Sequence, residues 1–238
     1  MVSNVAVSAV VLTVLVSGCL AGMVPTLGSA PPEPLPERPD TLTEQTVSNY
    51  TTTYEAAKTY NRHLDANPTE NQITCRSNTR VALESAFVVR VQCMGGVPLA
   101  NGQHIDVAVS THYYVSDNTT IRIDGDDFRS VRHRSYRPNL TSFDVVNLAN
   151  ESTPVHVELE RNGSESPLRL DYTIDPHSGV AQIGLQFEYG TTREMHVRTD
   201  DATTTAQFTS ERIDFASPTV VYILPDGQVR ITVGPSEP

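Results

Sequence analysis

Three polar residues in one strand-like segment form the best local arrangement for binding a metal ion. His104, Asp106 and His112 occupy even positions of a stretch whose odd positions are mostly apolar. In an extended strand they share the face turned from the core, but His112 lies far along it, at about 3.3 Å per residue. A compact zinc or copper site would need a ligand from another strand. We therefore interpret them as solvated polar residues and assign no metal ligand.

A second candidate site is the carboxylate cluster over residues 124–127. Asp124-Gly125-Asp126-Asp127 offers the oxygen ligands that calcium prefers. The twelfth residue counted from Asp124, where an EF-hand needs a bidentate glutamate, is Ser135. The composition therefore favours an acidic hairpin turn, with a loose calcium site as the alternative.

The residues that follow form the only basic stretch of the chain: Arg129, Arg132, Arg134 and Arg137, with His133 and Tyr136. We interpret this stretch as a charged connector between two domains that pairs with their carboxylates. Its alternative role is anchoring to an acidic neighbour or an anionic surface polymer.

Sequence motifs for catalysis are missing. The chain contains no GxSxG, SxxK or HExxH motif, no P-loop and no GxGxxG step. We therefore expect neither an enzyme nor a cofactor. Because the chain has 28 acidic and 17 basic residues, its surface should repel polyanions, which argues against binding to nucleic acid.

The N-terminus carries the clearest functional signal. An apolar run over residues 5–16 ends in Val16-Ser17-Gly18-Cys19. This pattern is typical of a lipoprotein signal peptide, in which the cysteine becomes the lipid-bearing first residue. Two lipid chains, at about 0.8 kcal/mol per buried CH₂, suffice for stable membrane attachment. We expect a lipid anchor on Cys19, with release of a soluble protein after cleavage between residues 21 and 30 as the alternative.

The two remaining cysteines are expected to form a disulfide. Alternating apolar residues predict an antiparallel hairpin over residues 73–83 and 87–93 in which Cys75 lies opposite Cys93. Directly opposed residues are within disulfide range, and the bond persists in an exported protein. Export also makes N-glycosylation available at five sequons: Asn49, Asn118, Asn139, Asn150 and Asn162.

The elements that position these residues begin with one helix. Thr41-Leu42-Thr43-Glu44 matches a capping box, and apolar residues at helical spacing follow until Asn67-Pro68. Four strands are then predicted at 73–83, 87–93, 103–115 and 119–124. One helix packed on a four-stranded antiparallel sheet makes an α+β domain.

The last hundred residues show only the strand pattern. Eight short strands separated by turn residues fit an all-β immunoglobulin-like sandwich, although a barrel would give the same pattern. The predicted organisation is a signal peptide, a Pro-rich tether, the α+β domain and the sandwich, at residues 1–18, 19–40, 41–138 and 139–238.

The Val16-Ser17-Gly18-Cys19 motif, the Pro-rich acidic spacer over residues 31–40 and the segment over residues 38–57 resemble the uncharacterised surface lipoproteins of haloarchaea. Lys58 is the only lysine, and a surplus of carboxylates suits a surface adapted to concentrated salt. The resemblance implies a location on the cell surface and a halophilic host, and it implies no reaction.

These patterns together predict a noncatalytic lipoprotein attached to the cell membrane through Cys19 and facing the exterior. It would serve as an interaction or structural module of a halophilic archaeon, and its further partner would be a cell-surface protein or polymer. The alternative is an extracellular solute- or metal-ion-binding lipoprotein that serves a transporter.

Overall fold

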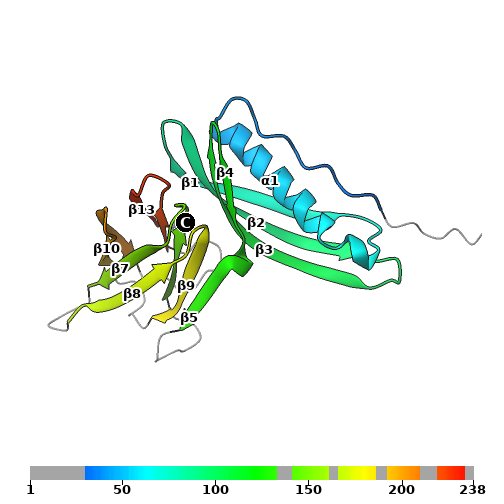
Figure 1. Cartoon of the computed structure of the whole chain (residues 1–238). Helices are drawn as coiled ribbons and strands as arrows, with labels where there is room; N and C mark the ends of the chain where they lie inside the picture. Colours follow the sequence, from blue (N-terminus) through cyan, green and yellow to red (C-terminus); the bar gives the residue numbers. More distant parts are fainter. Residues whose placement is uncertain (1–29, 133–140, 161–165, 186–191, 210–218, 234–238) are drawn as a thin grey trace, which may run out of the picture.

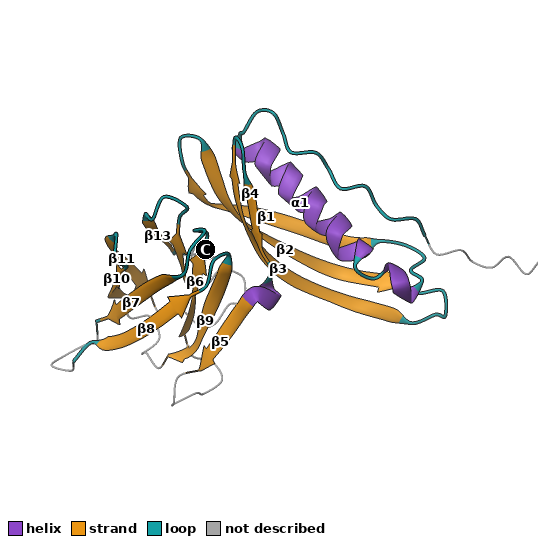
Figure 2. Ribbon diagram, in the orientation of Figure 1, coloured by secondary structure: helices purple, strands orange, loops and turns teal. Residues whose placement is uncertain are grey.

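The computed structural model describes residues 30–132, 141–160, 166–185, 192–209 and 219–233. Cys19, with the predicted signal peptide and the first part of the tether, lies outside the described residues. The described part is mostly β-structure, with one α-helix and strands arranged in three sheets (Figures 1 and 2). Among the described residues, no helix has both the length and the apolar character needed to cross a membrane.

The helix α1, Glu44–Asn61, lies along one face of the first sheet (Figure 1). Thr43 caps it: the Thr43 hydroxyl accepts a hydrogen bond from the Thr46 amide at 3.1 Å, and the Thr46 hydroxyl accepts one from the Thr43 amide at 2.9 Å. The predicted capping box between Thr41 and Glu44 is therefore wrong. A second threonine, rather than a glutamate, closes the box. After α1 the chain forms the 3₁₀ helix η1, Leu64–Ala66.

The first sheet has the strand order β1-β2-β3-β4 and is antiparallel throughout. Its strands are β1 Gln72–Ala82, β2 Ala86–Pro98, β3 His104–Ser116 and β4 Thr120–Ile123. Cys75 is the register partner of Cys93, and the two form a disulfide, so this prediction is confirmed. The bond lies under α1, beside a core made by Val47, Val89, Val91, Tyr113 and Val115.

A β-bulge in β1 changes which face its last residues occupy. The register shifts between Thr79 and Val81, which leaves Arg80 as the extra residue. Because side chains alternate across a strand, one inserted residue moves those that follow to the opposite face. Unbroken alternation would put Val81 and Leu83 on the face of Cys75, but after the bulge they pack into a different core.

The C-terminal strands form two sheets that pack face to face, a sandwich-like arrangement. The four-stranded sheet has the order β11-β10-β7-β8, and the five-stranded sheet has the order β13-β12-β6-β9-β5. The strands are β5 Phe128–Arg132, β6 Thr141–Asn147, β7 Thr153–Leu159, β8 Leu168–Ile174, β9 Ser178–Leu185, β10 Thr192–Arg198, β11 Thr203–Thr209, β12 Thr219–Ile223 and β13 Val229–Thr232. Buried side chains from both sheets make one core, including Phe143, Val157, Tyr172, Met195 and Val221.

The strand β5 was not predicted, and it lies before the boundary placed between residues 138 and 139. It pairs in parallel with β9, so it extends the five-stranded sheet of the sandwich. The short 3₁₀ helix η2, Gly125–Asp127, joins it directly to β4. Arg129 and Arg132 of the predicted connector are thus strand residues.

The two parts of the molecule share a hydrophobic core. Val88 and Ile123 of the first sheet pack with Val146, Val220 and Leu224 of the sandwich, all nearly fully buried. Figure 1 shows β4 running from the helix-covered sheet down to the sandwich. The packing fixes the position of one sheet system against the other, because separating them would expose this apolar surface to water.

Candidate functional site

The candidate site is the outer face of the four-stranded sheet in the sandwich. Along β7 the residues Val155, Val157 and Leu159 point into the core, whereas His156 and Glu158 between them point outward. The same alternation on β8, β10 and β11 gives one continuous polar surface, as expected for a sheet with one buried face. We define the outer face by its residues: His156, Glu158, Glu160, Arg169, Asp171, Glu194, His196, Arg198, Thr203 and Thr205.

Cross-strand register brings opposite charges together on part of this surface. His156 faces Asp171, and the His156 Nδ1 and Asp171 Oδ1 atoms are 2.5 Å apart. In the next row Glu158 faces Arg169, whose Nε donates to Glu158 Oε2 at 3.1 Å. These two pairs border a surface pocket of about 450 Å³. All four side chains are at least 41% exposed, so each pair contributes at most about 1 kcal/mol to stability.

Three neighbouring residues of the outer face carry groups that could bind a metal ion. Glu194 and His196 are two residues apart on β10 and share its outer side. Glu160 comes directly after β7, and its amide donates a hydrogen bond to the Glu194 carbonyl at 3.0 Å. One ligand atom from each side chain lies within 4.8 Å of the other two. Glu160 is far in sequence from Glu194 and His196, and only the pairing of β7 with β10 brings it to them, which is why the sequence analysis missed the group.

The predicted group of His104, Asp106 and His112 is divided by the structure. His104 and Asp106 are exposed neighbours, with His104 Nδ1 3.2 Å from Asp106 Oδ1. His112 is only 2% exposed, and its Nδ1 lies 2.8 Å from the Tyr222 hydroxyl of the sandwich. The prediction that His112 is solvated is therefore wrong, because the sandwich covers that end of the shared face of β3.

Burial beneath the sandwich changes the titration of this region. It lowers the pKa of His112 to about 3, and the positive charges of Arg90 and Arg80 act in the same direction. On β6, burial raises the pKa of Asp144 to about 6, against the opposing effect of the same two arginines. The region therefore holds a neutral imidazole inside a charged junction between the two sheet systems.

The carboxylates predicted as an acidic turn are held by arginines. Asp124 Oδ2 accepts hydrogen bonds from Arg62 at 2.7 Å and from Arg122 at 3.1 Å. Burial alone would raise the pKa of Asp124, but these bonds outweigh it and hold that pKa below its usual value. Asp127 caps η2 by accepting from the Asp124 amide at 2.9 Å, whereas Asp126 is 90% exposed. The predicted acidic hairpin turn is therefore wrong: residues 125–127 form η2, which connects β4 and β5 of two different sheets, and Asp124 is a structural anion at its start.

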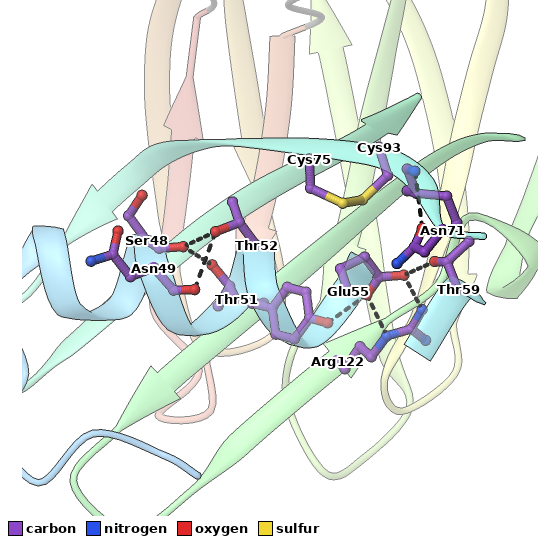
Figure 3. The surroundings of a disulfide bond; sticks show 12 residues. Ser48, Asn49, Thr51, Thr52, Glu55, Thr59, Asn71, Cys75, Cys93 and Arg122 are labelled. Carbon is purple, nitrogen blue, oxygen red and sulfur yellow. Dashed lines mark hydrogen bonds and ion pairs between the residues drawn. A yellow bond between two sulfur atoms is a disulfide. The ribbon is translucent and has the colours of Figure 1, made fainter. Parts of the chain in front are cut away.

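Glu55 is the most deeply buried carboxylate that the structure describes, and α1 places it against the first sheet. Arg122 donates to both of its oxygens, at 2.8 and 2.6 Å, and the Tyr113 hydroxyl donates to Oε2 at 2.5 Å. Burial raises the pKa of Glu55, and the bonds from Arg122 and Tyr113 more than reverse that effect. Figure 3 shows this carboxylate pointing at Arg122, on the same side of the sheet as the disulfide. These hydrogen bonds connect the Thr-rich helix α1 to β3 and β4 of the first sheet.

Three of the five predicted glycosylation sites lie within the described residues. Asn49, Asn118 and Asn150 are exposed. Asn139 and Asn162 lie outside the described residues, as do Cys19, His133, Arg134, Tyr136 and Arg137.

Comparison of the chain with protein-family models, with curated proteins and with solved structures finds no match.

Proposed function

We propose that the chain is a noncatalytic lipoprotein, held at the outer face of the cell membrane by a lipid on Cys19. The disulfide between Cys75 and Cys93 is the observation that carries this proposal. Such a bond forms and persists in an oxidising compartment, outside the cytosol. It also engages two of the three cysteines, which leaves Cys19, within the Val16-Ser17-Gly18-Cys19 motif, for the lipid.

The contacts of the buried ionisable groups support a noncatalytic role. Catalytic acids and bases usually have perturbed pKa values and face a cleft where substrate can reach them. Here Glu55 is enclosed by Arg122 and Tyr113, and His112 is packed against Tyr222. Burial, hydrogen bonds and neighbouring charges account for both pKa shifts without a reacting group.

The outer face is the surface we propose for contact with a partner. It presents carboxylates, imidazoles and guanidinium groups on a rigid sheet, a composition that suits a hydrated contact with a polar protein or polymer. The acid excess and single lysine fit a halophilic archaeal host, as the resemblance of the N-terminal segment implies. We also propose that the sandwich is immunoglobulin-like, because immunoglobulin-like sandwiches commonly serve as interaction modules.

Cell fractionation tests the anchor. In the native host, the unaltered chain should sediment with membranes, and the N-terminal peptide should carry the mass of a lipid on Cys19. The Cys19→Ser variant should leave the membrane fraction, because it has no thiol to lipidate. Cys75→Ala/Cys93→Ala is the matched control: it also removes thiols, and it should stay with the membranes. An unmodified Cys19 peptide in soluble protein would refute the proposal.

A further inference from the structure

The cluster of Glu160, Glu194 and His196 has the spacing of ligands around one metal ion. Two ligand atoms that are each about 2.1 Å from a tetrahedral zinc ion are about 3.4 Å apart. Glu194 Oε1 lies 3.4 Å from His196 Nε2, and Glu160 Oε1 lies 4.0 Å from the same nitrogen. A small rotation of the Glu160 side chain, which is 60% exposed, would bring the third ligand to the same spacing.

A neighbouring strand orients the imidazole for this role. His196 Nδ1 lies 3.0 Å from the hydroxyl oxygen of Thr205, its register partner on β11. When the Thr205 hydroxyl accepts a hydrogen bond from Nδ1–H, the lone pair of Nε2 is on the side of the two glutamates. Histidines that bind metal ions are usually held in this way, by a hydrogen bond from the second ring nitrogen to an oxygen.

Charge favours a cation at the same place. With a neutral imidazole, the two carboxylates give the cluster a charge of −2, and the Nε2 lone pair faces carboxylate oxygens. Arg169 lies in the same cross-strand row as His196 and donates to Glu158. A divalent ion would turn these repulsive contacts into ligand bonds.

We propose that Glu160, Glu194 and His196 bind a divalent transition-metal ion on the outer face, with water completing its coordination. One imidazole and two carboxylates form a mixed nitrogen and oxygen set that suits Zn²⁺. Mg²⁺ and Ca²⁺ prefer sites made of oxygen alone, so the imidazole disfavours them. This inference goes beyond the lipid anchor and does not depend on it.

Calorimetric titration of the full-length chain in detergent with Zn²⁺, Mg²⁺ and Ca²⁺ tests the site. Zn²⁺ should bind with a stoichiometry of one and at least about tenfold more tightly than the other two ions. His196→Gln and Glu194→Gln should each weaken Zn²⁺ binding at least about tenfold, and Thr205→Val should weaken it by about tenfold through loss of the imidazole orientation.

Two matched controls locate the effect. His156→Gln removes the other imidazole of the outer face, and His104→Gln removes the imidazole of the exposed pair with Asp106 on β3. Both should leave Zn²⁺ affinity unchanged, and thermal melting of each variant should confirm that it is folded. A Co²⁺-loaded chain should show a visible absorption band that His196→Gln abolishes.

Three results would overturn the proposal. The first is no Zn²⁺ binding to the folded, unaltered chain, which would leave the cluster as an ion pair only. The second is equal Zn²⁺ affinity in the unaltered chain and in the folded His196→Gln variant. The third is Zn²⁺ affinity lost equally in the His104→Gln control.

Discussion

The buried network around Glu55 gives the sharpest stability prediction. Glu55 is fully buried, and the Arg122 side chain is only 14% exposed. Replacing Glu55 by Gln keeps the shape but leaves the guanidinium without its closest anion. Removing one partner of a buried ion pair costs about 3–5 kcal/mol. Arg122 retains a contact with Asp124 at 3.1 Å, so we expect the lower end, about 3 kcal/mol.

Thermal and urea unfolding measure this loss. For a chain of this size, about 3 kcal/mol corresponds to a decrease in Tm of about 6–12 °C. The matched control is Glu158→Gln, which removes the partner of Arg169 in an exposed pair and should cost less than about 1 kcal/mol. The Glu55→Gln loss should persist in about 1 M salt, since salt screens buried pairs much less than exposed ones.

A triple replacement separates electrostatics from packing. Glu55→Leu, Tyr113→Phe and Arg122→Met together remove the buried charges and the hydroxyl without leaving one of these three groups unpaired. Because apolar replacements of a buried ion pair are often neutral or stabilising, the triple variant should recover most of the loss. A Glu55→Gln loss below about 1 kcal/mol, or one equal to that of Glu158→Gln, would refute the reasoning.

Three further changes test other parts of the fold. Cys75→Ala/Cys93→Ala should lower the free energy of urea unfolding by about 3 kcal/mol, because the bond closes a loop of 18 residues; a loss below about 1 kcal/mol would contradict this. Asp144→Asn should change the pH profile of Tm. The pKa of Asp144 is about 6 in the folded chain and 3.8 in the unfolded chain, so its contribution to stability is full below pH 3.8 and is lost as the pH rises through 6, about 3 kcal/mol in all. The variant should lack this decline, and parallel pH profiles of the two proteins would refute the assignment. Gly95→Ala should lower stability by about 1–3 kcal/mol, measured by thermal unfolding, because φ is +134° and a Cβ would clash with the backbone carbonyl of Gln72. Gly102→Ala, with open space around it, should cost less, and equal losses would exclude the clash.

Much of the first sheet could be predicted from local patterns. The alternation of apolar residues placed Cys75 opposite Cys93, and the short turn after β1 left that register nearly the only choice. The helix was predicted with a start a few residues early, since two threonine hydroxyls can close a capping box that the sequence assigns to a glutamate.

Long-range pairing decided the candidate site. Glu194 and His196 lie on β10, and Glu160, which follows β7, joins them only when β7 pairs with β10. His112 has the sequence pattern of a solvated residue, yet the sandwich buries it against Tyr222. A strand pattern records which side chains share a face, but it does not record what covers that face.

The sequence by itself determined the strand periodicity, the facing cysteines, the excess of carboxylates and the N-terminal motif that ends at Cys19. Each of these is a property of neighbouring residues or of composition. The tertiary structure alone decided the bulge at Arg80, the membership of β5 in the sandwich and the shared core between the sheet systems. Those features depend on contacts between residues far apart in the chain, where apolar burial selects one arrangement among many with the same local pattern.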